Sequence, residues 1–118
     1  MDVVKDFGKV SGATPDKIRK VNLFQTERFF ADVYVIGPGQ EQAPHAHAGS
    51  DKVYAVLTGG GSVRVDGARH PVRAGEAVLC PAGSEHAIEN LGFEDMRILV
   101  FMAPHPSPGA VAKPASGP

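Results

Sequence analysis

The stretch GEAVLCPAGSEHAIEN, residues 75–90, decides the fold that this sequence predicts. Gly75 and Gly83 suit turns whose backbone conformation other residues avoid. Pro81 ends a short apolar strand at a point where no ladder N–H is needed. His86 then begins another short strand, in which alternate side chains share one face. The stretch therefore predicts strand, turn and strand, which is typical of an all-β protein.

The same pattern of short strands and tight turns continues on both sides of this stretch. The 118 residues include 14 glycines and 10 prolines, which separate segments rich in β-branched and aromatic residues. The expected strands are 21–26, 29–36, 52–57, 62–65, 70–73, 77–80, 86–90 and 96–102. Helical periodicity is nearly absent, and only Thr14-Pro15-Asp16 predicts a short helical turn, reaching Ile18 and Arg19. About eight or nine short antiparallel strands predict a barrel or a sandwich.

The length of the chain fits one domain and is too short for two. We expect residues 1–103 to form that domain. Residues 104–118 are expected to form a flexible, proline-rich tail, because five of these last 15 residues are proline.

Charge and composition exclude several classes of partner. The chain carries 12 basic and 13 acidic residues, so a net charge of −1 gives no reason to expect nucleic acid or an anionic membrane. No apolar run approaches the ~20 residues of a membrane span, and the N-terminus does not resemble a secretory signal. Cys80 is the only cysteine, so no intrachain disulfide can form. These features predict a cytoplasmic protein.

Three histidines indicate a metal site. His45 and His47 stand in the sequence Pro44-His45-Ala46-His47, and His86 follows thirty-nine residues later. A His-x-His step in a strand directs both rings to one face, because side chains alternate with period two. A third imidazole from a neighbouring strand would complete a ligand set for a transition metal.

Two stretches resemble the paired motifs of the cupin superfamily. Residues 75–90 match every fixed position of the second motif: Gly, five residues, Pro-x-Gly, two residues, His, three residues, Asn. Residues 39–59 match the first motif at its opening glycine, its His-x-His pair and its closing glycine. The resemblance implies a double-stranded β-helix, the jelly-roll barrel of the cupins, open at one end with a metal bound inside.

Similar proteins commonly pair, so the resemblance also implies a homodimer. If Tyr54 and Val56 face the cavity, the alternate residues of that strand form an apolar outer face. An apolar outer face needs cover from its own chain or from a second subunit. The outward residues are then Val53, Ala55 and Leu57.

The glutamate of the first motif is missing from this chain. Asp51 comes three residues after His47 and Lys52 comes four after it, as the numbering shows. Counting back from Gly59 puts Lys52 at the ligand position and directs it into the barrel. If Asp51 turns inward instead, three histidines and one carboxylate suit Fe(II), Mn(II) or Ni(II). If Asp51 stays out, three histidines suit Zn(II) or Fe(II). An inward Lys52 would repel a metal, and could act as a base or anchor an anionic substrate.

The resemblance implies a metal-binding protein that acts on or binds a small organic molecule. The implied metal is a divalent ion of Fe, Mn, Ni or Zn, held by His45, His47 and His86, with Asp51 either as a fourth ligand or as a residue that supports the ligands. Tyr54 or Lys52 would move protons in dioxygenase, isomerase or lyase chemistry, between which the fold alone does not choose. The second class is a non-catalytic module that binds a small ligand, with its metal either kept or lost. Lys52 would tolerate the loss of the metal.

Overall fold

The computed structural model describes residues 2–110. These residues form nine strands: β1 (Arg19–Thr26), β2 (Phe29–Ile36), β3 (His45–Ala46), β4 (Asp51–Thr58), β5 (Gly60–Val65), β6 (Ala68–Arg73), β7 (Ala77–Cys80), β8 (Glu85–Glu89) and β9 (Met96–Ala103). They also form two short 3-10 helices, η1 (Phe7–Lys9) and η2 (Pro108–Ala110). The predicted all-β class is confirmed.

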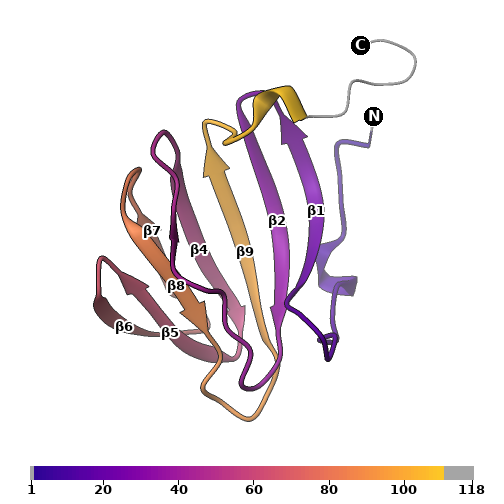
Figure 1. Ribbon diagram of the computed structural model, residues 1–118. Coiled ribbons are helices and arrows are strands. Elements are labelled where there is room, and N and C mark those ends of the chain that lie inside the picture. The colour runs from indigo at the N-terminus through magenta and orange to yellow at the C-terminus, as the bar shows by residue number, and fades with distance from the viewer. Residues whose placement is uncertain (1, 111–118) are drawn as a thin grey trace.

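The strands form two antiparallel sheets. One sheet has the order β1-β2-β9-β4-β7 and the other has the order β3-β8-β5-β6. Figure 1 shows the long strands β1, β2, β9 and β4 side by side, with β5 and β6 gathered at the end far from β1. Buried side chains from both sheets, among them Tyr34, Tyr54, Ile88 and Ile98, form one core between them. This is the double-stranded β-helix that the resemblance to the cupins implied.

Strand β4 shows how the alternation of residues divides inside from outside. Lys52, Tyr54 and Val56 are buried, whereas the residues between them are only partly buried. Both neighbours of β4 are antiparallel to it, so this register is fixed across β7, β4 and β9. The inward direction of Lys52, which the count from Gly59 predicted, is therefore built into the sheet.

The segments that carry the two motifs lie antiparallel beside each other. At one end the backbone N–H of Gly39 donates to the carbonyl oxygen of Asn90 at 3.0 Å. In the middle His45 pairs with His86 in the ladder between β3 and β8. At the other end the N–H of Gly83 donates to the carbonyl of His47 at 2.8 Å. The chain thus brings histidines that are distant in sequence to one place.

The short N-terminal helical turn is present, but it is η1 (Phe7–Lys9) and not the predicted segment after Thr14. The hydroxyl of Thr14 donates to the carbonyl of Lys17 at 2.7 Å, so it does not cap a helix. The chain then enters β1 at Arg19, where pairing with β2 outweighs the local preference.

Both ends of the described chain pack against the barrel. Arg97 of β9 donates from Nε to the carbonyl of Val10 at 2.7 Å, which holds the N-terminal segment on the sheet. The hydroxyl of Ser50 donates to the carbonyl of Pro104 at 2.7 Å. The division at residue 103 stays a prediction, because residues 111–118 of the proposed tail lie outside the described residues.

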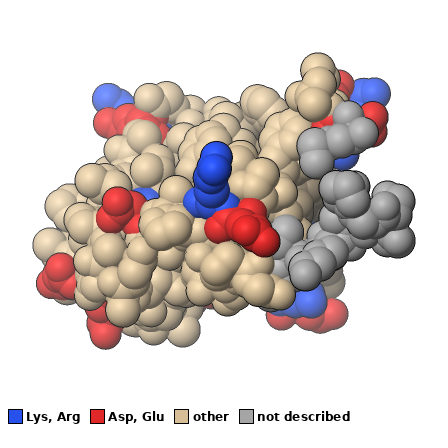
Figure 2. Space-filling view, turned by 90° about the horizontal axis from the view of Figure 1, so that it is seen from above, with Lys and Arg blue, Asp and Glu red and all other residues tan. Residues whose placement is uncertain are grey.

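The surface carries charges of both signs. Figure 2 shows Lys and Arg in small groups with Asp and Glu, separated by wide uncharged areas on the face in view. No helix within residues 2–110 has the length and apolar character needed to cross a membrane.

Candidate metal centre

The three predicted histidines come together between β3 and β8. One ring nitrogen from each of His45, His47 and His86 lies within 4.8 Å of the other two. The ring centroids of His45 and His86 are 4.3 Å apart, and those of His45 and His47 are 5.1 Å apart. The ladder between β3 and β8 sets the first distance, and the His-x-His spacing sets the second.

The hydrogen bonds of two rings show which nitrogen is free. The Nδ1 atom of His45 lies 3.0 Å from the carbonyl oxygen of Ala43, and that of His86 lies 3.2 Å from the carbonyl of Ser84. A carbonyl oxygen only accepts, so in the neutral rings Nδ1 carries the proton and Nε2 keeps its lone pair. Backbone carbonyls fix metal-ligating histidines in this way.

The Nε2 atom of His86 is the observation that tests the site for a metal. His86 is 2% exposed, and within the described chain its Nε2 has no hydrogen-bond partner. A buried acceptor without a partner costs free energy. A cation bound between the three rings would satisfy this nitrogen, so the residues present fit a metal ion.

The electrostatic surroundings keep these rings neutral. Burial, and then repulsion from His45, lowers the pKa of His86 to about 4. Burial also lowers the pKa of His45 and of His47 below the usual value for histidine. Neutral imidazole is the form that binds a metal, so little proton competition is expected at neutral pH.

Asp51 lies at the start of β4 and is exposed. Its Oδ1 accepts a hydrogen bond of 2.8 Å from the backbone N–H of Ala82, in the turn that precedes β8. The group of potential ligands found within residues 2–110 contains the three histidines and not Asp51. Asp51 therefore holds the turn that leads to His86.

Lys52 faces the inside of the barrel and is 2% exposed. Its Nζ lies 5.0 Å from the ring centroid of Tyr54 and 5.6 Å from that of Tyr34. Burial, and then repulsion from Lys20, lowers the pKa of Lys52 to about 8. Burying a cation costs several kcal/mol, and a desolvated cation–π contact returns about 2 kcal/mol or more. The lowered pKa of Lys52 indicates that the aromatic rings compensate only part of this cost.

Tyr54 connects the lysine side of the site with the histidines. Its hydroxyl donates to Oε1 of Gln42 at 2.9 Å, and its ring centroid lies 6.1 Å from that of His86. Burial raises the pKa of the Tyr54 phenol, so the group is neutral and donates a hydrogen bond. Gln42 is itself fixed to β8, because its N–H donates to the carbonyl of Ile88 at 2.8 Å.

Three residues near the site were not predicted from the sequence: Lys20, Asp32 and Gln42. Lys20 lies directly opposite Tyr34 in the ladder of β1 and β2, with Nζ 4.9 Å from the ring centroid. Asp32 accepts a hydrogen bond of 2.7 Å from Nδ2 of Asn22, and burial raises its pKa. The expected strand began at Val21, so the alternation that directs Lys20 to the ring of Tyr34 was missed.

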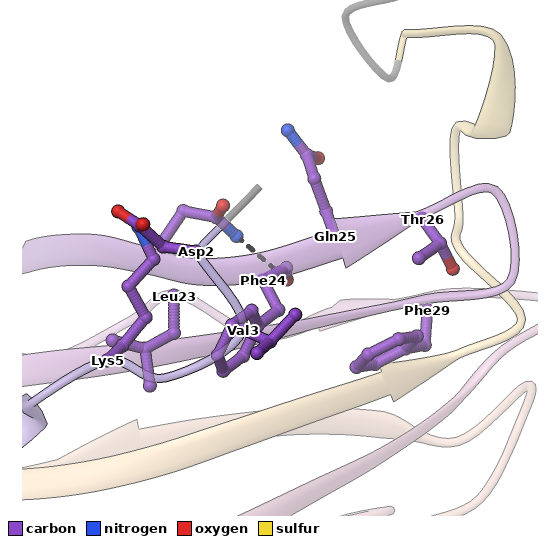
Figure 3. Close-up of a pocket in the computed structure, with 9 residues that line it drawn as sticks. Asp2, Val3, Lys5, Leu23, Phe24, Gln25, Thr26 and Phe29 are labelled. Carbon is purple, nitrogen blue, oxygen red and sulfur yellow. Dashed lines mark hydrogen bonds between the residues drawn. The ribbon is translucent and has the colours of Figure 1, made fainter. Parts of the chain in front are cut away.

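A separate hollow lies outside the barrel (Figure 3). It measures about 400 Å³ and lies between the N-terminal residues Asp2, Val3 and Lys5 and side chains of β1. Its other lining residues include Leu23, Phe24 and Phe29, so it is mainly apolar. It shares no residue with the histidine group.

Comparison with known proteins identifies the fold family. A family model described as a cupin domain matches residues 32–102. This chain belongs to the cupin family. The match contains all three histidines and both the lysine and the tyrosine of β4. The histidine group of this cupin therefore lies where the sequence motifs placed it.

Similar proteins of known structure or name come from several bacteria. The crystal structure of TT1209 from Thermus thermophilus has 38% identity and a TM-score of 0.82, and the match covers 86% of this chain and 97% of that one. Protein SchB of Streptomyces halstedii is 32% identical over 64% of this cupin and 54% of SchB. Dimethylsulfoniopropionate lyase DddW of Ruegeria pomeroyi is 42% identical over 42% of this cupin and 32% of DddW. This cupin thus spans about half of SchB and about a third of DddW.

Proposed function

We propose that this cupin binds a divalent transition metal through His45, His47 and His86 and acts on a small organic molecule there. The unpartnered Nε2 of His86, buried beside two further neutral imidazoles, carries this proposal. Three nitrogen ligands suit Zn(II) or Fe(II), and Mn(II) or Ni(II) remain candidates if a carboxylate joins them. Bound there, such an ion would act as a Lewis acid on substrate oxygen atoms.

The residues of β4 supply the groups that handle protons. Lys52, with a pKa of about 8, lies beside the rings of Tyr34 and Tyr54. The hydroxyl of Tyr54 donates to Gln42. Tyr54 stays protonated, donates its one proton to Gln42 and offers its oxygen to a substrate as an acceptor, whereas Lys52 exchanges its proton near neutral pH. Lyase, isomerase and dioxygenase chemistry all fit three histidines with Lys52 and Tyr54 beside them. The partial likeness to the lyase DddW favours lyase chemistry.

A second function is favoured by one observation, the buried ammonium group of Lys52 at the position where the motif has an acid. A cation there opposes a metal cation, so a binding module without metal would tolerate it. The two functions differ in metal affinity. The catalytic proposal expects tight stoichiometric binding, and the binding module expects none at the histidines.

The test is a titration of the metal-free protein with Zn(II) by calorimetry, and with Co(II) by visible absorption. We expect one ion per chain. His86→Ala should reduce the metal affinity about 100-fold or more, because one of the three metal ligands is lost. His70→Ala is the matched control, because His70 is exposed on β6. Circular dichroism of both variants checks the fold. Equal affinity of His86→Ala and the unmodified protein would exclude the three-histidine site.

We also propose that two copies of this cupin pair through the outer face of the five-stranded sheet, in the cytoplasm. Val53 lies opposite Leu79 on one side and Phe101 on the other. Leu79 is 58% exposed and Phe101 is 40% exposed, so an apolar row crosses three strands. Phe101→Lys is expected to yield monomers in light scattering, whereas Phe93→Lys, at a side chain outside this row, leaves the dimer intact.

A further inference from the structure

Two lysines from different strands face one tyrosine ring inside the barrel. Lys20 reaches the ring of Tyr34 from β1, and Lys52 reaches it from β4. Their ammonium nitrogens lie 4.9 Å and 5.6 Å from the same ring centroid. Two cations that share one ring repel each other, which is one cause of the lowered pKa of Lys52.

The two lysines are only partly neutralised by the surrounding protein. Within residues 2–110 neither Lys20 nor Lys52 forms an ion pair with a carboxylate within 4.0 Å. Asp32 is the carboxylate that interacts with both lysines, but its Oδ1 is bound by Asn22. His105 adds a further titratable group near Asp32. Two lysines and one aspartate leave a single positive charge, which one monoanion would balance.

Lys20, the exposed member of the lysine pair, lines a surface groove. A groove of about 630 Å³ is lined by Lys17, Lys20, Glu41 and Gln42, among others. Gln42 accepts the hydrogen bond of Tyr54, whose ring faces that of His86. Lys20 and Gln42 therefore connect this groove with the two tyrosines and, through Tyr54, with His86.

We propose that Lys20 and Lys52 bind the carboxylate of a small monoanionic substrate and direct its other end toward the three histidines. This inference rests on the proposed function and names its substrate class. The tyrosine rings contact the apolar part of the substrate, and the two ammonium groups hold its charge. A monocarboxylate matches the residual charge of the pair better than a phosphate monoester, which carries close to two charges at neutral pH.

The test compares two probes of nearly equal shape, butyrate and butyramide, by calorimetry on the metal-free chain of 118 residues. We expect butyrate to bind at least about tenfold more tightly than butyramide, because only the anion pairs with the lysines. Lys20→Gln and Lys52→Met are each expected to weaken butyrate about tenfold and to leave butyramide unchanged. Equal binding of the two probes would overturn the proposal.

Two controls keep the result interpretable. Lys17→Gln removes a charge from the same groove and is expected to change butyrate affinity by less than about threefold, because exposed charges contribute little. If Lys17→Gln weakened butyrate binding as much as Lys20→Gln and Lys52→Met do, the effect would come from the total charge of the groove. That result would also overturn the proposal. Lys20 is exposed, so its variant tests the pair even if Lys52→Met unfolds.

Zinc titration of the same samples separates this inference from the proposed function. If zinc fails to bind at the histidines while butyrate still depends on both lysines, the metal proposal fails and the lysine pair stands. If zinc binds at the histidines while butyrate and butyramide bind alike, the lysine proposal fails and the metal site stands.

Discussion

The carboxylate of Asp51 accepts a hydrogen bond from the backbone N–H of Ala82, with Oδ1 and N 2.8 Å apart. This bond joins the acid nearest to the missing glutamate of the first motif to the turn of the second motif. Because that turn leads into β8, the bond links Asp51 to the segment that carries His86.

Substitutions at Asp51 distinguish between two roles of its carboxylate: binding the metal directly, and holding the turn at Ala82. Asp51→Asn keeps an oxygen acceptor for Ala82, so we expect zinc affinity within about threefold of the unmodified protein. Asp51→Ala removes the acceptor and is expected to lower zinc affinity about tenfold and stability by about 1 kcal/mol. Calorimetry and urea unfolding measure both effects. A large equal loss in the two variants would show that the carboxylate binds the metal directly.

Lys52→Glu restores the acid of the first motif at an inward position. We expect zinc affinity to rise about tenfold or more, because a repelling cation is replaced by an attracting carboxylate. Lys52→Met removes the charge alone and should give a smaller gain. If neither variant changes zinc affinity, the ammonium group does not act on the histidine centre.

The metal-free protein should lose stability in acid through His86. Its folded-state pKa of about 4 lies below the usual 6.5, so the unfolded chain binds the proton first as pH falls. The stabilisation is therefore complete above about pH 6.5 and is lost toward pH 4. We expect a loss on the order of 2 kcal/mol after solvent screening, measured by urea unfolding from pH 7 to pH 4. In His86→Gln the free energy of unfolding should depend less on pH over this range. If it fell with pH as steeply as in the unmodified protein, His86 would not be the source of the acid sensitivity.

Gly61 tests the packing of β5 against β8. A Cβ atom at this position would overlap the carbonyl oxygen of Glu89 and lie 3.0 Å from the sulfur of Met96. We expect Gly61→Ala to destabilise the fold by about 2 kcal/mol, because backbone must move to admit the methyl group. Gly49→Ala is the control, since a Cβ there meets no atom within 4 Å. Equal unfolding midpoints for the two variants would contradict this account.

The strands were predictable because their signals are local. β2 (Phe29–Ile36) and β7 (Ala77–Cys80) begin and end as expected, since glycine or proline punctuates a β-branched and apolar run. The Asp66–Gly67 turn also joins β5 and β6 as expected. The helical turn after Thr14 was misplaced, because pairing with β2 is a long-range effect that no local pattern contains.

The three histidines were predictable from motif spacing, but their surroundings were not. The direction of Lys52 followed from counting along one strand. The bond between Asp51 and Ala82 depends on how β4 lies beside the turn before β8, and that arrangement has no local signal. Lys20 and Gln42 reach the site from β1 and from an irregular segment, so only the tertiary structure brings them to the tyrosines.

The antiparallel pairing of the two motif segments has a consequence for the growing chain. His45 and His47 leave the ribosome well before His86, and β8 must be present before the ladder of β3 can form. A chain truncated before β8 therefore offers only two of the three nitrogens. If the proposed metal binds there, its capture must wait until His86 has been synthesised and β8 has paired with β3.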